Sequence, residues 1–426
     1  MAKNITREYR RNFEIDIERF PAVVFESDDW GTCSSVKGEE DLAAYFKAMG
    51  METVSGSVST LETAELLESL FQVLRKHLGK DGVPAVFTAF TNMGNPDFAA
   101  IEQSGFSKYF DIPLGKGFPP GWNDSGCVAK TLQGFQEGVW QPEYHALLHH
   151  NNPELWLERL RGSGAAAEKA RALFRLGCFS QCEHLPEYTG YDLRQQYDMI
   201  DSGFSRFEQL FGYTPNAAIC SDAFPETELL WALRGAKTIC LKNFKKRGTV
   251  IVYHTKPWNN QDPYAKIGDV DPLAGVAYLT RNASFGPADG SDENSDYAEE
   301  CFQDIMRNFC MEKEPAVVQT HRANYTVLES EYADRRLAML DSLLRKLSEK
   351  GVHYLTSGEL GDLYRQGWST RKIGGRQLLR KWSAVDCAFA QGVEAETGKT
   401  TAISKATLGS FWLCPETTAS NTFVPV

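Results

Sequence analysis

Short apolar runs alternate with longer amphipathic stretches along most of this chain. The apolar runs are continuous rather than strictly alternating, which is typical of strands that are buried on both faces of a parallel sheet. The runs that predict strands are residues 22–25, 85–90, 216–220, 238–241, 250–253, 276–279 and 316–319.

The stretches between these runs have apolar residues at helical spacing. They predict helices at residues 60–78, 155–160, 165–176, 193–211, 295–309 and 329–350. The regular succession of strand and helix predicts an α/β fold, either a βα barrel or an open doubly wound sheet.

Three segments interrupt this succession. Residues 111–128, 255–275 and 284–294 are rich in Gly, Pro, Asn or Asp and predict long loops. After about residue 370 the composition shifts to Gly, Thr, Ser and Ala, with only short apolar runs. We therefore expect an α/β unit at residues 1–370 and a small β-rich C-terminal extension, residues 371–426, packed on it.

The composition limits the class of protein. The 426 residues carry a net charge of −11, with 42% hydrophobic and 24% charged residues, as in an ordinary soluble globular protein. This excludes disordered, collagen-like and coiled-coil chains. The acidic balance argues against nucleic acid or an anionic membrane surface as the main partner.

Ten cysteines are scattered without a dense framework, which predicts reduced, mostly buried thiols. The first residues are too polar for a signal peptide, and no apolar run has the length of a membrane span. We therefore expect a cytoplasmic protein. The sequence does not predict an oligomeric state.

The first candidate for chemistry is the pair Asp28 and Asp29, which follows the predicted strand at residues 22–25. Catalytic groups of α/β barrels lie at this end of the strands. Neighbouring carboxylates on an extended chain point in different directions, so one could bind a metal while the other takes a proton. The alternative is an ordinary turn with an Asp as helix cap.

The second candidate is a concentration of histidines. His145 and His149 are four residues apart, and on a helical turn both imidazoles would face the same side and could share a metal with a carboxylate. The alternative is a polar helix face with unrelated histidines. Glu143 is either a partner that orients an imidazole or a solvated side chain.

The third candidate is His321, at the end of the predicted strand at residues 316–319 and next to Arg322. A histidine at a strand end is well placed to donate a proton to a leaving group, although an ordinary surface histidine is the alternative.

In their order along the chain, these three candidates resemble the motifs of the polysaccharide deacetylase superfamily, also called the NodB-homology or carbohydrate esterase 4 family. An apolar strand that ends in Asp28-Asp29, the spacing of His145 and His149, and a late strand that ends in His321 all have counterparts there. The resemblance spans roughly residues 20–365. It implies a distorted βα barrel of the deacetylase type with long loops.

The resemblance also implies roles for these residues. Asp28 would be the general base, and His321 would be the general acid. Asp29, His145 and His149 would bind one divalent metal. Zinc is the expected metal, with cobalt, nickel or iron as alternatives.

The chain also departs from the family pattern. Trp30 stands where the family has Gly, and the proline usual after the second His is absent. His150 could replace His149 as a ligand. The family's Arg-Pro-Gly type motif is hard to place, and Asp222 in that region either lines the pocket or caps a helix.

Four residues are candidates for substrate contact, and the departures leave the identity of the sugar and acyl group open. The candidates are Trp30, Asp222, Arg281 and Arg322. Trp30 offers an aromatic face to a sugar ring. Arg281 follows the predicted strand at residues 276–279, and an ordinary surface position is its alternative.

The function expected from these residues is metal-dependent hydrolysis of an amide, removing an N-acetyl or related acyl group from a sugar or glycan. The first alternative is a metal-free glycoside hydrolase on a related barrel, with Asp28 and Asp222 as its carboxylate pair. The second is a non-catalytic carbohydrate-binding protein.

Overall fold

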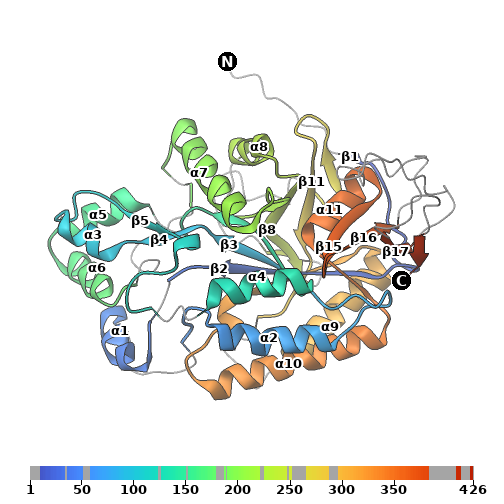
Figure 1. The fold of residues 1–426 in the computed structure, drawn as a ribbon, viewed down its shortest axis with the longest axis horizontal. Coiled ribbons are helices and arrows are strands. Elements are labelled where there is room, and N and C mark those ends of the chain that lie inside the picture. Colours follow the sequence, from blue (N-terminus) through green and yellow to red (C-terminus); the bar gives the residue numbers. More distant parts are fainter. Residues whose placement is uncertain are drawn as a thin grey trace.

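The structure is a computed structural model. It describes residues 10–33, 36–50, 58–122, 126–149, 152–178, 187–188, 190–220, 225–246, 249–251, 265–286, 296–382, 409–413 and 423–425. Figure 1 shows a central sheet with helices above and below it, a lobe of short helices at one end, and a small sheet near the C-terminus.

The central sheet is built mainly from parallel strands. Its order runs β11, β8, β7, β6, β3, β2, β13 and β12, and β14 pairs with the beginning of β2. The strands are β2 (Ala22–Trp30), β3 (Phe87–Asn92), β6 (Trp140–Ala146), β7 (Ala217–Ala218), β8 (Thr238–Lys246), β11 (Val276–Arg281), β12 (Ala283–Ser284), β13 (Ala316–His321) and β14 (His353–Leu355).

The two ends of this sheet meet at Asn282. β11 pairs with β8, and β12 pairs with β13, yet only Asn282 separates β11 from β12. The Asn282 amide group bridges the junction, since its Oδ1 accepts from the Val317 backbone N–H at 2.8 Å. The sheet therefore curls into a distorted barrel, which is one of the two folds expected from the sequence, and the open sheet is excluded.

Further antiparallel strands extend the sheet at its edge. The pairs are β10 (Asp269–Asp271) with β11, β1 (Arg10–Arg11) with β10, and β9 (Thr249–Ile251) with β8. The parallel strands are buried almost throughout, as in β3, β11 and β13. This burial explains why their sequences are continuous apolar runs.

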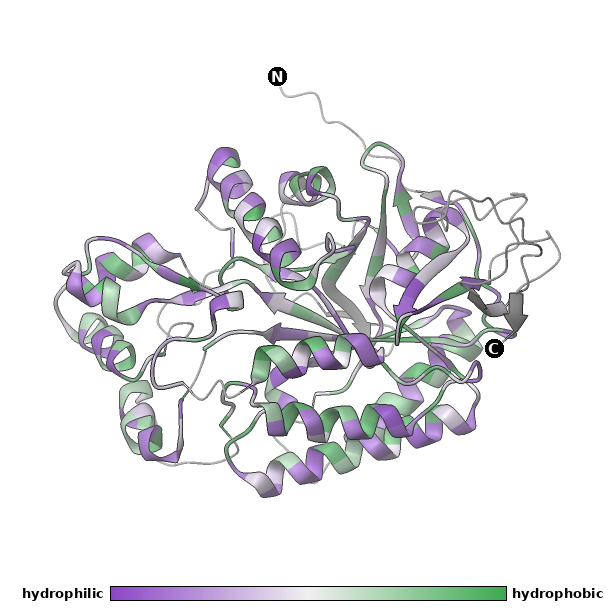
Figure 2. Cartoon of the chain, viewed as in Figure 1, coloured by the Kyte–Doolittle hydropathy of each residue, from purple (hydrophilic) through white to green (hydrophobic). Residues whose placement is uncertain are grey.

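Helices cover both sides of the barrel (Figure 1). Below the sheet lie α2 (Ala64–Lys76), α4 (Cys127–Glu137), α9 (Tyr297–Arg307) and α10 (Ser330–Glu349), and above it lie α7 (Leu193–Phe211) and α8 (Pro225–Arg234). α11 (Ser357–Gln366) packs against β2, β8 and β11. Figure 2 shows apolar and polar stripes along α2 and α10, and in α2 the buried stripe is Leu67, Leu70, Phe71 and Leu74.

A lobe of short helices extends from the barrel. It contains α1 (Leu42–Met49), α3 (Phe98–Gln103), α5 (Pro153–Arg161), α6 (Ala165–Arg175) and a small hairpin of β4 (Gly94–Pro96) and β5 (Asp111–Pro113). Trp156 and Phe174 lie in the apolar cluster that holds α3, α5 and α6 together. The loop between β6 and α5, which carries His149, connects this lobe to the barrel.

The C-terminal residues form a second sheet. It contains β15 (Ser369–Ile373), β16 (Arg376–Lys381), β17 (Gly409–Leu413) and β18 (Phe423–Pro425), all antiparallel. This agrees with the expected β-rich extension, whose first strand begins two residues before the expected boundary at residue 371. The division of the chain into two units stays a prediction.

Buried charges join this sheet to the barrel. Arg380 donates to Glu359 at 2.6 Å and to Asp81 at 3.0 Å, and Ser410 donates to Asp81 at 2.8 Å. Burial alone would raise the pKa of Asp81, but Arg380, His353 and Ser410 lower it well below its ordinary value. The sheet is therefore held by an ionised, hydrogen-bonded network rather than by apolar contacts alone.

The sequence predicted most helices but not every strand. The helix expected at residues 193–211 is α7, and the strand expected at residues 22–25 continues to Trp30 as β2. β6 was not predicted, because it carries Gln, Pro, Glu and His among its seven residues. Polar residues can occupy such a strand where it faces the interior of a barrel that holds a site. Three parts of the predicted elements lie outside the described residues: residues 252–253 of the strand expected at 250–253, residues 255–264 of the loop expected at 255–275, and residues 287–294 of the loop expected at 284–294.

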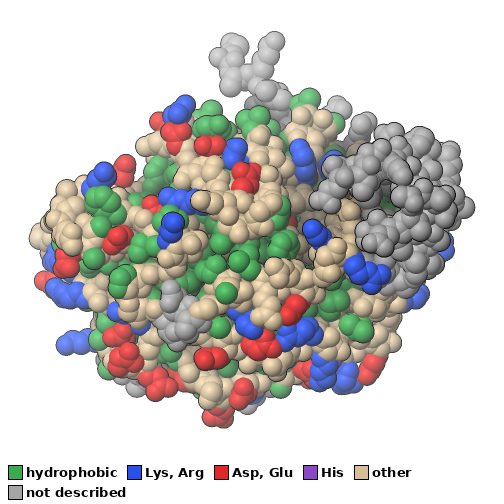
Figure 3. Space-filling model, viewed as in Figure 1, with side chains coloured by type: hydrophobic (Ala, Val, Ile, Leu, Met, Phe, Trp, Pro, Cys, Tyr) green, Lys and Arg blue, Asp and Glu red, His purple; other side chains and the backbone are tan. Residues whose placement is uncertain are grey.

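The surface agrees with the acidic but mixed composition. On the face drawn in Figure 3, Lys and Arg are interspersed with Asp and Glu over the described residues. Among the helices of the described ranges, none is both long enough and apolar enough to cross a membrane.

We predict that Arg380 of the C-terminal sheet is essential for stability. Arg380→Met would remove the guanidinium that binds the buried Asp81 and would leave Glu359 with Arg371 alone, 3.5 Å away; loss of one partner of a buried pair costs about 3–5 kcal/mol. Urea unfolding measures this change. Arg345→Met, which removes only an exposed pair with Glu349, is the control and should change the free energy of unfolding by less than about 1 kcal/mol. Equal effects of the two substitutions would contradict the prediction.

Candidate metal centre

The end of β2 turns its two neighbouring aspartates in different directions. The pairing of β2 with β3 shifts register between Ser27 and Trp30, so the strand bulges there. Within the bulge Asp29 has a φ of 73°, a conformation that Asp tolerates better than most residues. Asp28 therefore points into the barrel, while the Asp29 carboxylate faces His145 and His149. The two aspartates can take separate roles only because they point in different directions.

Buried polar groups hold the turn that follows Asp29. The backbone N–H of Gly31 donates to Glu62 Oε1 at 2.7 Å, and the Gly31 carbonyl accepts from Asn95 Nδ2 at 2.8 Å. Gly31 has a φ of 77°, and a Cβ there would lie 2.8 Å from the Asn92 carbonyl oxygen. In the family pattern a Gly follows the second Asp directly. In this chain Trp30 stands at that position, and Gly31 comes one residue later, where the turn requires a positive φ.

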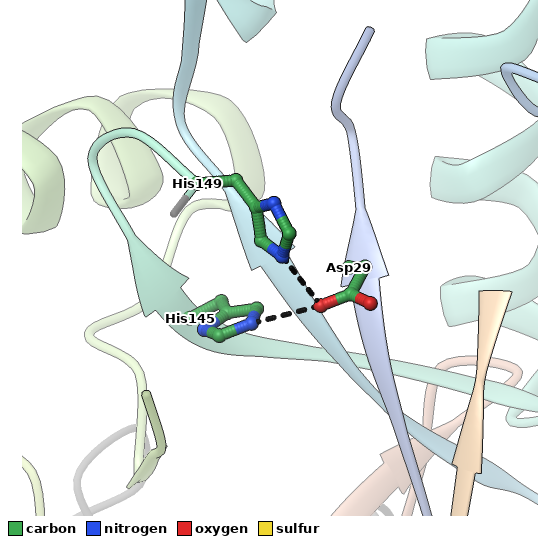
Figure 4. A group of neighbouring side chains, drawn as sticks. All are labelled: Asp29, His145 and His149. Carbon is green, nitrogen blue, oxygen red and sulfur yellow. Dashed lines mark hydrogen bonds and ion pairs between the residues drawn. The ribbon is translucent and has the colours of Figure 1, made fainter. Parts of the chain in front are cut away.

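His145 and His149 meet Asp29 from β6 and the loop that follows it (Figure 4). His145 Nε2 lies 3.1 Å and His149 Nε2 lies 2.8 Å from the same Asp29 Oδ1. The expectation of a helical turn is wrong, because His145 is in a strand and His149 is in a bend. The two imidazoles converge because the chain folds back after β6.

The donor set suits a divalent metal. One donor atom from each of Asp29, His145 and His149 lies within 4.8 Å of the others. His145 Nδ1 lies 3.0 Å from the Ile219 carbonyl oxygen, so the proton belongs on Nδ1 and the Nε2 lone pair faces Asp29. Two imidazole nitrogens and a carboxylate oxygen are ligands that zinc and similar metals accept. These three residues could therefore hold the metal that the sequence motifs imply.

The charges of the site favour the same conclusion. Burial alone would raise the pKa of Asp29, but His149, His145 and His321 lower it well below its ordinary value. Burial lowers the pKa of His149, and the charge of Asp29 offsets only part of this effect. An ionised carboxylate beside a neutral imidazole is the protonation state that binds a metal.

Asp28 is held by a buried arginine. Arg281 Nη2 donates to Asp28 Oδ1 at 2.6 Å, and Nη1 donates to Oδ2 at 3.0 Å. The Arg281 Nε donates to Glu26 Oε2 at 2.8 Å, and Glu26 Oε1 accepts from Ser357 Oγ at 2.9 Å. Burial would lower the pKa of Arg281, but Asp28 and Glu26 raise it above its ordinary value. Asp28 is thus fixed by two charge-assisted bonds.

His321 lies opposite Asp28 on the neighbouring strand. The parallel pairing of β13 with β2 puts the two residues in register, and His321 Nε2 lies 3.7 Å from Asp28 Oδ2. The His321 side chain is 19% exposed, whereas Asp28 is fully buried. The structure therefore brings together all five residues that the sequence motifs assign to the metal and to proton transfer.

The residues expected to contact substrate are placed differently. Trp30 is buried against Trp140, with its Nε1 donating to Ser27 Oγ at 2.9 Å. Arg281 is buried on Asp28 and Glu26, as described above. Asp222 and the alternative ligand His150 lie outside the described residues.

Arg322 is buried as well. It donates to the Thr60 carbonyl oxygen at 2.6 Å and lies 3.4 Å from Glu62 Oε2, so it supports the side chain that holds the Asp29 turn. These contacts of Trp30, Arg281 and Arg322 are with the protein itself. Direct contact of these residues with substrate stays a prediction.

Sequence reasoning missed Glu26 and Glu187. Glu26 is two residues before Asp28 on a buried strand and therefore shares its face, a signal that was present in the sequence. Glu187 is fully buried, and its Oε1 lies 3.9 Å from His145 Nδ1. No motif marks it, since it is more than 40 positions away from its histidine in the chain.

Comparisons with known proteins give matches among solved structures only. No protein-family model matches the sequence, and a search of curated proteins finds no match. A protein from Mycobacterium smegmatis that is assigned as a polysaccharide deacetylase has 10% sequence identity and a TM-score of 0.39, over 81% of this chain and 90% of that chain. The chain resembles polysaccharide deacetylases.

Two further solved structures are similar to this chain, with lower TM-scores. A CE4 family pseudoenzyme from Bacillus anthracis has 9% identity and a TM-score of 0.33, over 79% of this chain and 63% of that chain. A peptidoglycan N-acetylglucosamine deacetylase has 10% identity and a TM-score of 0.31, over 80% and 92% of the two chains. These structures belong to the superfamily that the sequence motifs resemble, and the function of this chain is argued from its own site.

Glu143 is neither solvated nor a partner of an imidazole. It is buried on β6, and its Oε2 accepts from the Ala217 backbone N–H at 2.8 Å. Burial raises the pKa of Glu143 to about 8, although the hydrogen bond from Ala217 acts in the opposite direction.

The raised pKa of Glu143 predicts a pH-dependent stability. Between its ordinary value of 4.5 and about 8, the unfolded chain loses the proton while the folded chain keeps it, so the free energy of unfolding falls as pH rises. Glu143→Gln removes this contribution. Urea unfolding at about pH 5 and about pH 8 should show the variant gaining stability relative to the wild type as pH rises. A pH-independent difference would contradict the prediction.

Proposed function

We propose that this protein is a metal-dependent hydrolase that removes an N-acetyl or related acyl group from a sugar or glycan. The observation that carries the proposal is the convergence of Asp29, His145 and His149 beside a fixed carboxylate and a partly exposed histidine. A non-catalytic binding protein has no evident use for this combination.

A divalent metal bound by these three residues would polarise the amide carbonyl and lower the pKa of a bound water toward neutrality. The chain supplies Asp29 in the ionised form and His149 in the neutral form, because the neighbouring histidines lower the pKa of Asp29 and burial lowers that of His149. The Ile219 carbonyl keeps His145 in the tautomer whose Nε2 faces Asp29.

Asp28 is the proposed general base. It would take the proton of the attacking water on Oδ2, the oxygen that accepts from Arg281 Nη1 at 3.0 Å and lies 3.7 Å from His321 Nε2. Arg281 cannot take that proton itself, and it fixes the carboxylate in one orientation. Positioning of this kind contributes to the rate because the reacting groups need no rearrangement.

His321 is the proposed general acid. Its Nε2 lies 3.7 Å from Asp28 Oδ2, and its partial exposure lets it reach a substrate at the mouth of the site. It would give a proton to the amine nitrogen as the carbon–nitrogen bond breaks. Collapse of the tetrahedral intermediate then releases the carboxylic acid, acetate in the simplest case, and the free amine.

The partners follow from the same reasoning. A carbohydrate or another acetylated small molecule is the proposed substrate, and the net charge of −11 does not favour nucleic acid. Zinc is the proposed metal, with cobalt, nickel or iron as alternatives. A location in the cytoplasm stays a prediction from the sequence.

We predict that the metal depends on the three proposed ligands. The wild-type protein should bind about one divalent metal per chain, and His145→Ala and Asp29→Ala should each abolish stoichiometric binding. Elemental analysis after dialysis measures this. His77→Ala is the control, since this histidine is paired with Asp341 instead. A wild-type protein that binds no metal and releases sugar from a glycoside in the presence of a chelator would favour the metal-free glycosidase.

We also predict that Asp28→Asn separates catalysis from metal binding. The amide keeps the shape of the carboxylate but cannot accept the proton, so acetate release from acetylated amino sugars should fall by about 100- to 10,000-fold. Metal content should stay at the wild-type value, because Asp28 is bound by Arg281 and is not one of the proposed ligands Asp29, His145 and His149. Unaltered acetate release would remove Asp28 as the base.

A further inference from the structure

Glu187 is a buried carboxylate behind the proposed metal ligands. Its side chain has no exposed surface, and its Oε1 lies 3.9 Å from His145 Nδ1. Nδ1 is the ring nitrogen turned away from Asp29, because the opposite nitrogen, Nε2, makes the 3.1 Å contact with Asp29 Oδ1. Glu187 is therefore on the far side of the imidazole and is not placed to ligate a metal held between Nε2 and Asp29.

The neighbouring residue holds Glu187 in place. The Tyr188 hydroxyl lies 3.4 Å from the hydroxyl of Tyr144, which precedes His145 on β6. The Tyr188 ring packs edge-on against Trp231, with ring centroids 6.1 Å apart. Because Tyr188 is buried between β6 and α8, the position of the Glu187 backbone is tied to the strand that carries His145.

The contact with His145 acts through charge rather than through a hydrogen bond. At 3.9 Å the Glu187 oxygen is beyond hydrogen-bond distance, and the Nδ1 proton is already directed to the Ile219 carbonyl at 3.0 Å. The carbonyl thus sets the tautomer, while Glu187 adds a negative charge behind the ring. The same charge also acts on His149. Glu187 and His145 are both fully buried, and charges interact more strongly in a buried environment than in water.

A divalent cation in this site would not be neutralised by its ligands. Asp29 supplies one negative charge, and the two imidazoles supply none, so one positive charge remains. Asp28, Glu26 and Arg281 together carry one negative charge on the β2 side of the site, and Glu187 lies on the opposite side, behind His145. We propose that Glu187 is a positioning residue of the metal site, which neutralises the bound cation through His145 without ligating it.

This inference rests on the proposed function, because it presupposes the metal site. The test uses the full-length protein and zinc ions alone, with affinity measured by competition against a chromophoric chelator. Glu187→Gln keeps the size of the side chain and removes its charge. It should weaken zinc binding by about 10- to 100-fold, the usual effect of removing a partner behind a ligand. Glu187→Asp, which keeps the charge, should lose less affinity than Glu187→Gln.

Two further measurements separate this role from a structural one. The Co²⁺ form of Glu187→Gln should keep a tetrahedral absorption spectrum, because the three ligands are unchanged. Asp304→Asn, which alters a buried carboxylate on α9 paired with Arg307, should leave zinc affinity unchanged. Glu187→Met removes the same charge and replaces Glu187→Gln as the test variant should the amide fail to fold.

The outcomes distinguish the two proposals. A wild-type protein that binds neither zinc nor cobalt would overturn the proposed function itself. A wild-type protein that binds zinc, with Glu187→Gln matching Asp304→Asn, would overturn only the role of Glu187. A variant that unfolds more readily in urea without metal, yet binds zinc as tightly as the wild type when folded, would reduce Glu187 to a structural residue.

Discussion

The positive charge of Arg281 is enclosed by the barrel, and it can stay there only because two carboxylates surround it. Removing an ion from water costs several kcal/mol unless partners compensate it. Glu26 and Asp28, two residues apart on one face of β2, supply this compensation from a single strand. The orientation of Asp28 is therefore set by the stability of the barrel interior, and the proposed catalytic arrangement follows from it.

This constraint also determines how Asp29 reaches the histidines. With Asp28 committed to the barrel interior, the next carboxylate can face the histidines only if the strand leaves its regular course. The bulge and the positive φ of Asp29 provide this change of direction, at a cost of about 1–3 kcal/mol for such a conformation. Glu62 and Asn95 bind the backbone of Gly31 and keep the turn in place. The local strain is thus held by buried polar groups.

The sequence predicted the parts of the fold that depend on burial. Apolar runs marked β2, β11 and β13, because strands enclosed on both faces are apolar nearly throughout. The ends of those strands also pointed to Asp28 and His321. β6 was not predicted, because its sequence is partly polar. Of these polar residues, His145 faces the site, and Glu143 accepts a hydrogen bond from a backbone N–H.

Long-range partners could not be predicted from spacing. The interval between His145 and His149 suggested a helix, but a strand followed by a bend produces the same convergence. Arg281 was a candidate for substrate contact, and no pattern predicted its pairing with Asp28 across about 250 residues of sequence. Pairings of this kind depend on how the barrel closes at Asn282, which no local pattern records.

The C-terminal sheet has a consequence for the shortest chain that can sustain the site. Arg380 binds Glu359 of α11, and the first residue of that helix, Ser357, binds Glu26 beside Arg281. A chain that stopped after α11 would retain every proposed catalytic and ligating residue. It would also lose the Arg380 guanidinium that binds Asp81 and Glu359, directly behind the helix that supports Glu26. The minimal functional unit therefore reaches past the barrel to at least β16, although no proposed catalytic or ligating residue lies there.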